Sequence, residues 1–507
     1  MSKPVFKAYQ QNQAWLIPPS LDDLIDINHP VRVVSEVIDS IDIDMLISKY
    51  KGGGASSYHP RMLLKVLVYS YLNNVYSSRK MEAAVKENIH FMWLAGMSQP
   101  DHHTLNRFRS ERLRNVLREI FAQIVLLLVD SGHVNLKEVY TDGTKIQSAA
   151  NRYTFVWGRA INTSKERIKQ QLRELWKYTQ KLAANEKGDD TPPDFDKIEA
   201  KEVKATIERI NTALKGKDID PKVKAKLNYA RKNWPSRLRQ YARQQKILKS
   251  RNSYSKTDPG ATFMRMKEDH MRNGQLKPGY NAQISTNNQF VVNYSLHTNP
   301  TDTKTLIPHL KGHKQLYGHL PEVQVTDAGY GSHENYQYLQ RQGIEAYIKP
   351  SDFDRKQRKN YQSKNPFATE HLIYDEQADV YLCPASKPMK SIGIFKEKEG
   401  GIIKQYSYYK ASGCKGCSLR ELCHKQKNNR VIKVNHKGRK LKQQAYDRLK
   451  TEKGIYYRKR RPADVEPVFG NIKHNKGFNR FMLKGIEKTE IEWGLLCIAH
   501  NLSKIAV

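Results

Sequence analysis

The chain has 507 residues, too many for a single compact core, which suggests about three domains or large insertions. It carries 87 Lys and Arg against 51 Asp and Glu, a formal net charge of +36 that is spread along the whole length. So large an unpaired charge repels itself unless a polyanion neutralises it. The composition therefore argues against a merely soluble basic protein and favours a nucleic-acid partner.

The N-terminus predicts a protein that is neither exported nor inserted into a membrane. Its first residues, MSKPVFKAYQQNQAW, lack the apolar core of a signal peptide. The longest apolar run, from Ile124 to Val129, is far below membrane-spanning length. We expect a cytoplasmic protein without a membrane partner.

The first part of the chain, residues 1–134, is expected to be an N-terminal helical DNA-binding domain. MLLKVLVYSYL is dense enough in apolar side chains for a buried helix, and Asp101 can cap a helix that begins HHTLNRFRSER. Arg107 and Arg109 on this last helix are candidate DNA contacts of a helix-turn-helix unit. An ordinary helical bundle with solvated arginines accounts for the same pattern, and the sequence does not separate the two.

After Asn135 the pattern changes to strands. LKEVYTDGTKI is a short strand that ends at Asp142, and GYNAQIST and QFVVNYSLH are two strands joined by a turn. A helix (DTKTLIPHLKGHKQL), a strand ending at Asp327 (PEVQVTDAGYGS), a helix (HENYQYLQRQG) and a strand (IEAYIKP) follow. This order predicts a mixed α/β sheet, which we assign to residues 135–350 plus 451–507.

Two insertions are expected to interrupt this sheet domain. The first, residues 152–271, is helical and basic, with 25 Lys and Arg against 12 Asp and Glu between residues 151 and 250. Its first helix carries apolar residues at coiled-coil spacing, namely Ile168, Leu172, Leu175 and Leu182. This spacing suits an arm that lies on DNA or a dimerising helical hairpin; a solvated decoration is the alternative.

The second insertion, residues 351–450, holds four of the five cysteines: Cys383, Cys414, Cys417 and Cys423. In a reducing compartment such a cluster argues for metal ligation before disulfides. Cys414 and Cys417 form a Cys-x-x-Cys turn, and the other two can complete a tetrahedral structural zinc site, with His424 as a substitute ligand. Buried thiols without a metal are the alternative.

Three acids stand out by position. Asp142 and Asp327 each end a strand and precede a turn, where a sheet presents side chains to a cleft and a carboxylate suits a hard divalent cation. Glu466 is an acid within a strongly basic helical segment, RRPADVEPVFGNIKHNKGFNRFMLKG. Seven residues separate it from Lys473, so we expect both side chains on one helix face. Alone, an Asp at a strand end is most often a turn former.

Together these stretches resemble the DDE transposases of bacterial insertion sequences, in particular the insertion-sequence 1182 group within the insertion-sequence 4 clade. The resemblance covers nearly the whole chain. It rests on the following stretches: SLDDLIDINHPVR, PDHHTLNRFR, VYTDGTKIQS, DPGATFMRMK, GYNAQI, VTDAGYGS, CKGCSLRELC, VEPVFGNIKHNKGFNRFMLKG and LLCIAHNLSKI.

This resemblance implies an RNase H-like catalytic core in which Asp142, Asp327 and Glu466 are the catalytic carboxylates. They would hold two Mg²⁺ (or Mn²⁺) ions, one activating a water or a 3′-hydroxyl and the other stabilising the leaving 3′-oxygen during in-line attack on phosphorus. Water as the attacker cleaves the DNA end, and the freed 3′-hydroxyl as the attacker joins that end to target DNA. The implied partners are the terminal inverted repeats and target DNA, in the nucleoid of a prokaryotic cell.

The clade also carries a Tyr-x2-Arg-x3-Glu-x6-Lys signature, which this chain matches in part. Glu466 and Lys473 have its spacing, but Pro462 occupies the arginine position and suits the first turn of a helix. The basic run before it supplies candidate DNA contacts, as does the lysine of the signature: Arg458, Arg460, Arg461 and Lys473.

Two other functions remain open from the sequence. One is an RNase H-like nuclease or resolvase that cuts without strand transfer, and the other is a DNA-binding regulator without catalysis. All three acids are present, which favours an enzyme. A DNA substrate with two ends, together with the coiled-coil-like helix, favours a homodimer.

Overall fold

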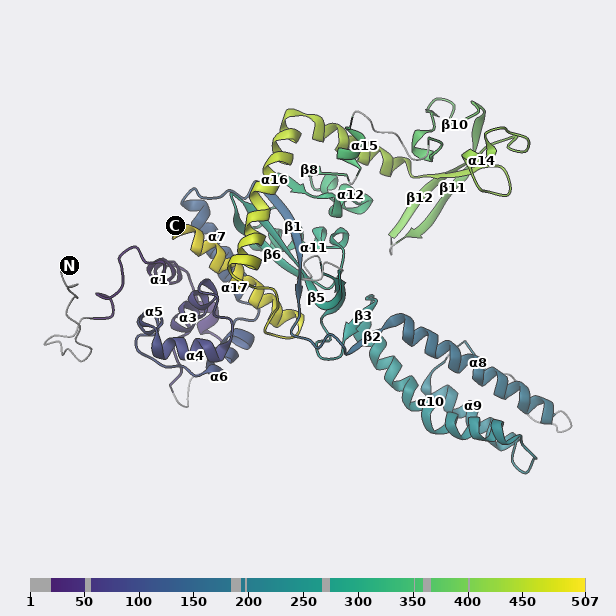
Figure 1. The fold of residues 1–507 in the computed structure, drawn as a ribbon, viewed down its shortest axis with the longest axis horizontal. Coiled ribbons are helices and arrows are strands. Elements are labelled where there is room, and N and C mark those ends of the chain that lie inside the picture. The colour runs from purple at the N-terminus through teal and green to yellow at the C-terminus, as the bar shows by residue number, and fades with distance from the viewer. Residues whose placement is uncertain are drawn as a thin grey trace, which may run out of the picture.

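The computed structural model describes residues 20–50, 56–183, 193–196, 198–266, 274–350, 352–358, 366–399 and 402–506. Figure 1 shows a central sheet with the N-terminal helices to one side and two bodies that project from it. One body is helical, and the other contains the strands β10 to β12. The predicted end of the first insertion, at residue 271, and residue 351 at the start of the second lie outside the described residues.

The N-terminal part is helical, as predicted. Its elements are α1 (Pro30–Ser40), α2 (Asp44–Ile47), α3 (Pro60–Leu72), α4 (Ser78–Glu87), α5 (Ile89–Leu94), α6 (His102–Arg107), a π-helical turn (Phe108–Arg112) and α7 (Leu117–Asp130). The side chain of Asp101 accepts a hydrogen bond from the backbone N of Thr104, so it caps α6 as expected. The apolar residues of α3, including Leu64 and Leu67, are buried.

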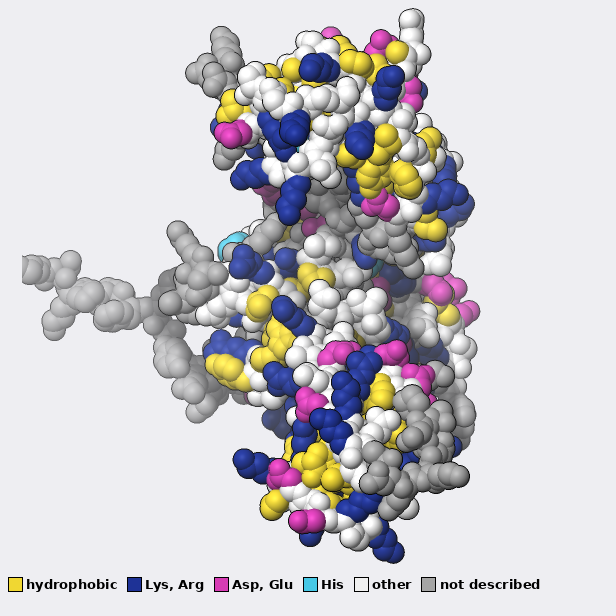
Figure 2. Space-filling view, turned by 90° about the vertical axis from the view of Figure 1, so that its right-hand side faces the viewer, with side chains coloured by type: hydrophobic (Ala, Val, Ile, Leu, Met, Phe, Trp, Pro, Cys, Tyr) yellow, Lys and Arg dark blue, Asp and Glu magenta, His cyan; other side chains and the backbone are white. Residues whose placement is uncertain are grey.

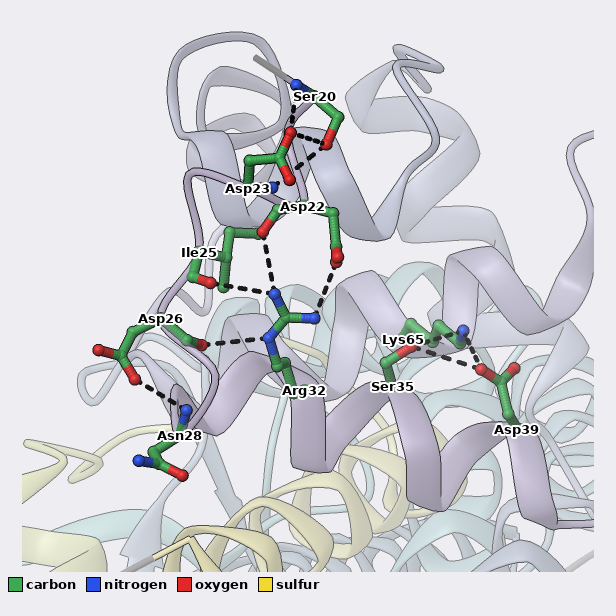
Figure 3. A network of polar contacts seen from close by, with 10 residues as sticks. All are labelled: Ser20, Asp22, Asp23, Ile25, Asp26, Asn28, Arg32, Ser35, Asp39 and Lys65. Carbon is green, nitrogen blue, oxygen red and sulfur yellow. Dashed lines mark hydrogen bonds and ion pairs between the residues drawn. The ribbon is translucent and has the colours of Figure 1, made fainter.

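The segment before α1 is held by one arginine (Figure 3). Arg32 on α1 forms an ion pair with Asp22 at 2.8 Å, and its guanidinium also donates to the carbonyl oxygens of Asp22, Ile25 and Asp26. Lys65 on α3 forms an ion pair with Asp39 at 2.6 Å, which ties α3 to the end of α1. The carboxylate of Asp22 therefore fastens this segment to α1, whereas those of Asp23 and Asp26 accept hydrogen bonds from Ser20 and Asn28 within the segment.

The central sheet has six strands: β1 (Glu138–Gln147), β4 (Thr262–Arg265), β5 (Leu276–Asn287), β6 (Phe290–His297), β7 (Val323–Thr326) and β8 (Glu345–Ile348). β5 lies between β1 on one side and β4 and β6 on the other, and all of these pairings are antiparallel. β1 pairs in parallel with β7, which pairs in parallel with β8. The predicted mixed α/β sheet is confirmed.

Helices cover both faces of this sheet, and alternate residues of a strand contact different layers. Tyr347 on β8 belongs to the large core formed with α7, α16 (Glu452–Gly470) and α17 (Ile486–Ile505). Its neighbours Ala346 and Ile348 belong to a second core with α11 (Leu306–Tyr317) and α12 (His333–Arg341). Within the described ranges, no helix combines the length and apolar character that crossing a membrane requires.

The helical insertion folds on itself. It begins with β2 (Phe155–Trp157), returns through β3 (Ser253–Ser255), and carries α8 (Gly158–Ala183), α9 (Ala200–Ala213) and α10 (Pro221–Leu248) between them. Ile168, Leu172 and Leu175 are buried in one core with residues of α9 and α10. The coiled-coil spacing therefore reflects packing within this chain, and these residues are not exposed for a dimer contact. Leu182 is 39% exposed.

The second insertion is built around a five-stranded antiparallel sheet. Its strands are β9 (Tyr374–Asp375), β10 (Val380–Leu382), β11 (Pro388–Glu399), β12 (Ile402–Lys410) and β13 (Val431–Val434). Short helices α13 (Phe353–Lys356) and α14 (Arg420–Cys423) flank it, and α15 (His436–Lys450) leads back to the core. Short 3-10 turns occur at Asp302–Lys304, Ala328–Tyr330 and Thr369–His371.

A buried polar network joins the N-terminal helices to α17. Glu492 on α17 is fully buried and lies 4.0 Å from the guanidinium of Arg109, which is 3% exposed. Its carboxylate accepts hydrogen bonds from Tyr71 and from the backbone N of Met482 and Leu483. Arg109 also donates to the hydroxyl of Tyr71. Removing either charge would leave the other buried without its partner, which is strongly destabilising.

The interpretation of Arg109 as a DNA contact is therefore wrong, because its guanidinium is occupied inside the protein. A helical pattern in the sequence is the same for an arginine exposed to solvent and for one paired with an acid far along the chain. Arg107, two residues earlier, is exposed.

His500 on α17 makes the stability of the core depend on pH. Its Nε2 donates to the carbonyl oxygen of Gln289 at 2.9 Å, Asn471 contacts its Nδ1, and burial lowers the pKa of His500 to about 4. The neutral ring is the folded form, whereas the unfolded residue titrates near pH 6.5. Its contribution to stability is thus present above pH 6.5 and is lost as the pH falls towards 4.

We expect the difference in unfolding free energy between the protein and H500Q to shrink by about 2 kcal/mol when the pH is lowered from 7.5 to 5. Urea unfolding at both pH values measures this difference. H133Q is the matched control, because His133 is exposed. If H500Q and the parent protein lost the same stability on acidification, His500 would not be the titrating group.

Candidate active site

The two aspartates predicted at strand ends lie side by side in the sheet, but only Asp327 follows the end of its strand. The prediction for Asp142 is wrong, because β1 continues through Asp142 to Gln147, where it still pairs with β5. Thr141 on β1 is the parallel partner of Thr326 on β7, so Asp142 is the next residue on β1 and Asp327 directly follows the end of β7. Neighbouring strands are about 4.8 Å apart, which places the two backbones side by side. Both side chains are partly buried. The structure therefore brings together residues that are far apart in the sequence.

Local hydrogen bonds orient both carboxylates. Asp142 Oδ1 accepts from the backbone N of Gly143, and Asp327 Oδ1 accepts from the backbone N of Gly329, both at 2.8 Å. Gly143 is required by space, because a Cβ at this position would lie 2.0 Å from Nε2 of Gln283 on β5. The space beside Gly143 is thus filled by the side chains of Gln283 and Asp302.

Arg461 on α16 binds the first aspartate. Its Nη2 lies 2.7 Å from Oδ2 of Asp142, and both side chains are less than one-fifth exposed. The buried Nε of Arg461 has no hydrogen-bond partner. The ion pair links α16 to β1 and places a cation directly against the candidate catalytic carboxylate.

A third acid, Asp302, lies against the two aspartate turns and was not singled out from the sequence. Its Oδ1 accepts hydrogen bonds from the side-chain amides of Asn281 (2.7 Å) and Gln283 (3.0 Å) on β5. Its carboxylate oxygens lie 2.8 and 3.3 Å from the Cβ positions that side chains at Gly143 and Gly329 would have. Asp302 lies in a turn after β6 and is followed by Thr303. It therefore lacks the pattern that singles out Asp142 and Asp327 in the sequence, which is an acid after a strand-like run and before Gly or Ala.

Tyr330 experiences all of these charges. Burial raises the pKa of its hydroxyl well above the usual value, and Asp302, Asp142 and Asp327 add to this shift while Arg461 opposes it. The hydroxyl donates to the side-chain oxygen of Gln283. Tyr330 therefore stays protonated and acts as a neutral donor beneath the acidic cluster.

Glu466 lies on α16, which packs across β1, β5 and β7. Its side chain is exposed, whereas Lys473 is 8% exposed. The expectation that both project from one helix face is wrong, because α16 ends at Gly470 and the chain continues as a π-helical turn, Asn471–Asn475. A π-helical turn contains more residues than an α-helical one and so changes the direction of the residues that follow.

The basic run before Glu466 lies within α16, not in a loop. Pro462 is inside the helix rather than in its first turn, and a second proline, Pro467, follows. Arg460 donates to Asn288 at 2.5 Å, and the guanidinium of Arg458 lies 4.8 Å from the centre of the Phe353 ring. A helix with two internal prolines loses backbone hydrogen bonds. Here the burial of Tyr457, Val465 and Val468 keeps it in place.

The carboxylates do not form a metal site in this arrangement. Among the described residues, no three His, Cys, Asp or Glu side chains are grouped closely enough to hold one ion. Asp142 within β1 and Asp327 directly after β7 are ligands of the right kind. Arg461 is paired with one of them, however, and Glu466 is exposed on its helix.

The four clustered cysteines lie around one cavity of the second insertion, although they too are not grouped closely enough to hold an ion. Cys383, Cys414, Cys417, Cys423 and His424 line one small cavity of about 20 Å³. Nε2 of His424 is buried without a hydrogen-bond partner, and Arg430 donates to Sγ of Cys423 at 3.0 Å. The cavity has room for about one water-sized group. The fifth cysteine, Cys497, is buried in α17 and lies away from this cavity.

Two parts of the chain match known protein families. Residues 382–506 match the family described as "Transposase DDE domain", and residues 19–111 match the family described as "Transposase domain (DUF772)". The first match contains Glu466 and every residue that lines the cysteine cavity, while Asp142 and Asp327 lie outside both matches. No curated protein and no solved structure matches the chain. The two family matches support a DDE-type insertion-sequence transposase that acts on DNA.

Proposed function

We propose that this protein cleaves DNA at the ends of an insertion sequence and joins the freed 3′-hydroxyl to target DNA. The observation that carries the proposal is the pairing of β1 with β7, which sets Asp142 beside Asp327, beneath the helix that bears Glu466. The net charge of +36 suits a DNA substrate. Asp142, Asp327 and Glu466 are the proposed catalytic residues.

The strand order supports an RNase H-like core. Three antiparallel strands (β6, β5, β1) continue into two parallel ones (β7, β8), and α16 covers the strands that carry the aspartates. We propose the core at residues 135–350 plus 451–507 and a DNA-binding domain at residues 1–134. Residues 152–271 and 351–450 are the proposed insertions, except that β4 (Thr262–Arg265), within the first range, pairs with β5 and belongs to the central sheet.

Mg²⁺ or Mn²⁺ is the proposed cofactor, because carboxylate oxygens are the ligands that these hard divalent cations prefer. Asp142 and Asp327 are held in place by backbone N–H groups, and Asp142 is neutralised by Arg461. Arg461, the cation beside Asp142, can also form an ion pair with a DNA phosphate. Arg461 has one buried donor, Nε, without a partner, which supports such a contact.

The proposed DNA contacts on the C-terminal segment are Arg458, Arg460, Arg461 and Lys473, and on the N-terminal helices Arg107. A homodimer is proposed because the substrate has two ends. The leucine stripe of α8 does not provide its interface, since Leu172 and Leu175 are buried within the insertion.

A structural zinc ion is proposed for the cysteine cavity. The four sulfur atoms and His424 Nε2 are of the donor types that zinc prefers, and the cavity is small enough for a single ion. The ion would fasten β10 and the segment around α14 onto one sheet that is otherwise small. The proposal is supported because Cys383 and His424, 41 positions apart in the chain, line the same cavity.

We expect D142N, D327N and E466Q each to reduce cleavage and strand transfer by at least about 10²-fold, because each removes a charge from the reacting centre. The substrate is a duplex carrying the DNA that flanks the gene, with Mg²⁺ or Mn²⁺ present. Gel analysis separates cleaved from joined product. E452Q is the matched control, since Glu452 is exposed on the same helix as Glu466.

A second substrate, nicked in advance and carrying a free 3′-hydroxyl, separates transposition from simple hydrolysis. Joined product supports the proposal, whereas release of fragments alone identifies a nuclease. Full activity of any one of the three variants would remove that residue from the site.

For the zinc ion we expect metal analysis of the unchelated protein to find about one zinc per chain, and C414S/C417S to lose it. C497S should retain the metal, because this thiol is buried in α17. If the purified, unchelated protein contained no zinc, the proposed zinc site would be ruled out.

A further inference from the structure

A large cleft opens beside the acidic turns and is not part of the site described above. Its volume is about 770 Å³, and its walls come from the 3-10 turn after β6, the start of α12, strand β12 and the start of α15. Four cations line it, namely Lys304, Arg341, Lys404 and Lys437, against one acid, Glu334. In Figure 1, β12 and α12 lie on neighbouring parts of the fold, where the second insertion meets the core.

The cleft is joined to the candidate active site by hydrogen bonds. Thr303 lines the cleft and directly follows Asp302 in the chain. Its hydroxyl donates to the carbonyl oxygen of Gly329 at 3.0 Å, in the turn after Asp327. Asn335 on α12 donates to the carbonyl oxygens of Thr303 (3.0 Å) and Tyr330 (2.7 Å). The wall of the cleft and the acidic turns therefore form one hydrogen-bonded unit.

Cations from separate elements converge on one histidine in this cleft. His333, at the start of α12, has its pKa lowered first by burial and then by Lys437 of α15 and Lys404 of β12. Its Nδ1 is buried without a hydrogen-bond partner and lies 3.3 Å from the Cβ position of a side chain at Gly438. Two lysines brought close to a third basic group repel one another, and a bound polyanion would relieve this repulsion.

The lining also indicates which nucleic acid it suits. Hydroxyl groups of Ser332 and Ser407 accompany the cations, and these are groups that bind phosphate oxygens. Among the described residues of the lining there is no Phe, Tyr or Trp, the side chains on which unpaired bases stack. The chemistry is that of phosphate contact without base stacking.

We propose that this cleft binds the phosphate backbone of duplex DNA and guides the duplex that is cut towards Asp142 and Asp327. The direction of guidance rests on the proposed function, whereas the binding rests on the cleft alone. The second insertion would thus form part of the DNA surface, through Lys404 on its sheet and Lys437 at the start of the helix that leads back to the core.

The test measures binding of a 30-bp duplex of arbitrary sequence by fluorescence anisotropy, without divalent metal and over a range of salt concentrations. We expect K404Q/K437Q to reduce the slope of log K against log[salt] by about 2, and R341Q on α12 to reduce it by about 1. The matched control is K390Q/K410Q: these two lysines are exposed, pair with each other on β11 and β12 and lie outside the cleft.

Equal slopes for K404Q/K437Q, R341Q and the control would overturn the proposal. A single strand of the same sequence is measured in parallel. If the cleft variants lost binding to the single strand but still bound the duplex, duplex DNA would not be the ligand of the cleft. If the cleft variants weaken duplex binding but the parent protein neither cleaves nor joins DNA, the cleft binds DNA as proposed and the proposed function is wrong.

Discussion

The position of β1 in the middle of the sheet is the constraint on which the rest of the molecule depends. It pairs antiparallel with β5 and parallel with β7, so Asp142 is fixed beside the end of β7. The close approach of Gln283 leaves no space for a side chain at Gly143. A slip of one residue would turn Asp142 to the other face of the sheet, away from α16 and Arg461.

The two ends of the chain are fastened to each other around this sheet. Tyr71 and Arg109 of the N-terminal helices meet Glu492 of α17, and α17 packs on β6. The helix that carries Glu466 belongs to the same C-terminal segment. A chain lacking the N-terminal helices would leave the buried carboxylate of Glu492 without Tyr71 and Arg109.

The basic residues of this protein fall into two groups that composition does not separate. Arg109 and Arg461 are paired with acids inside the fold, and Arg32 holds the segment before α1. Others are spread over the two projecting bodies, where Figure 2 shows many Lys and Arg side chains among fewer acids. Only the exposed group can contribute to long-range attraction of a polyanion.

The sequence by itself determined the order of five of the six core strands and of the helices between them, the cap at Asp101 and the strand that ends before Asp327, because periodicity, turns and caps are local properties. It did not find β4, and it ended β1 too early at Asp142. The tertiary structure decided what lies next to what. It paired Arg461 with Asp142, buried Arg109 against Glu492, brought Asp302 to Gly143 and Gly329, and turned Lys473 away from Glu466. These contacts join residues as many as 383 positions apart, as with 109 and 492, and no local pattern encodes such a distance.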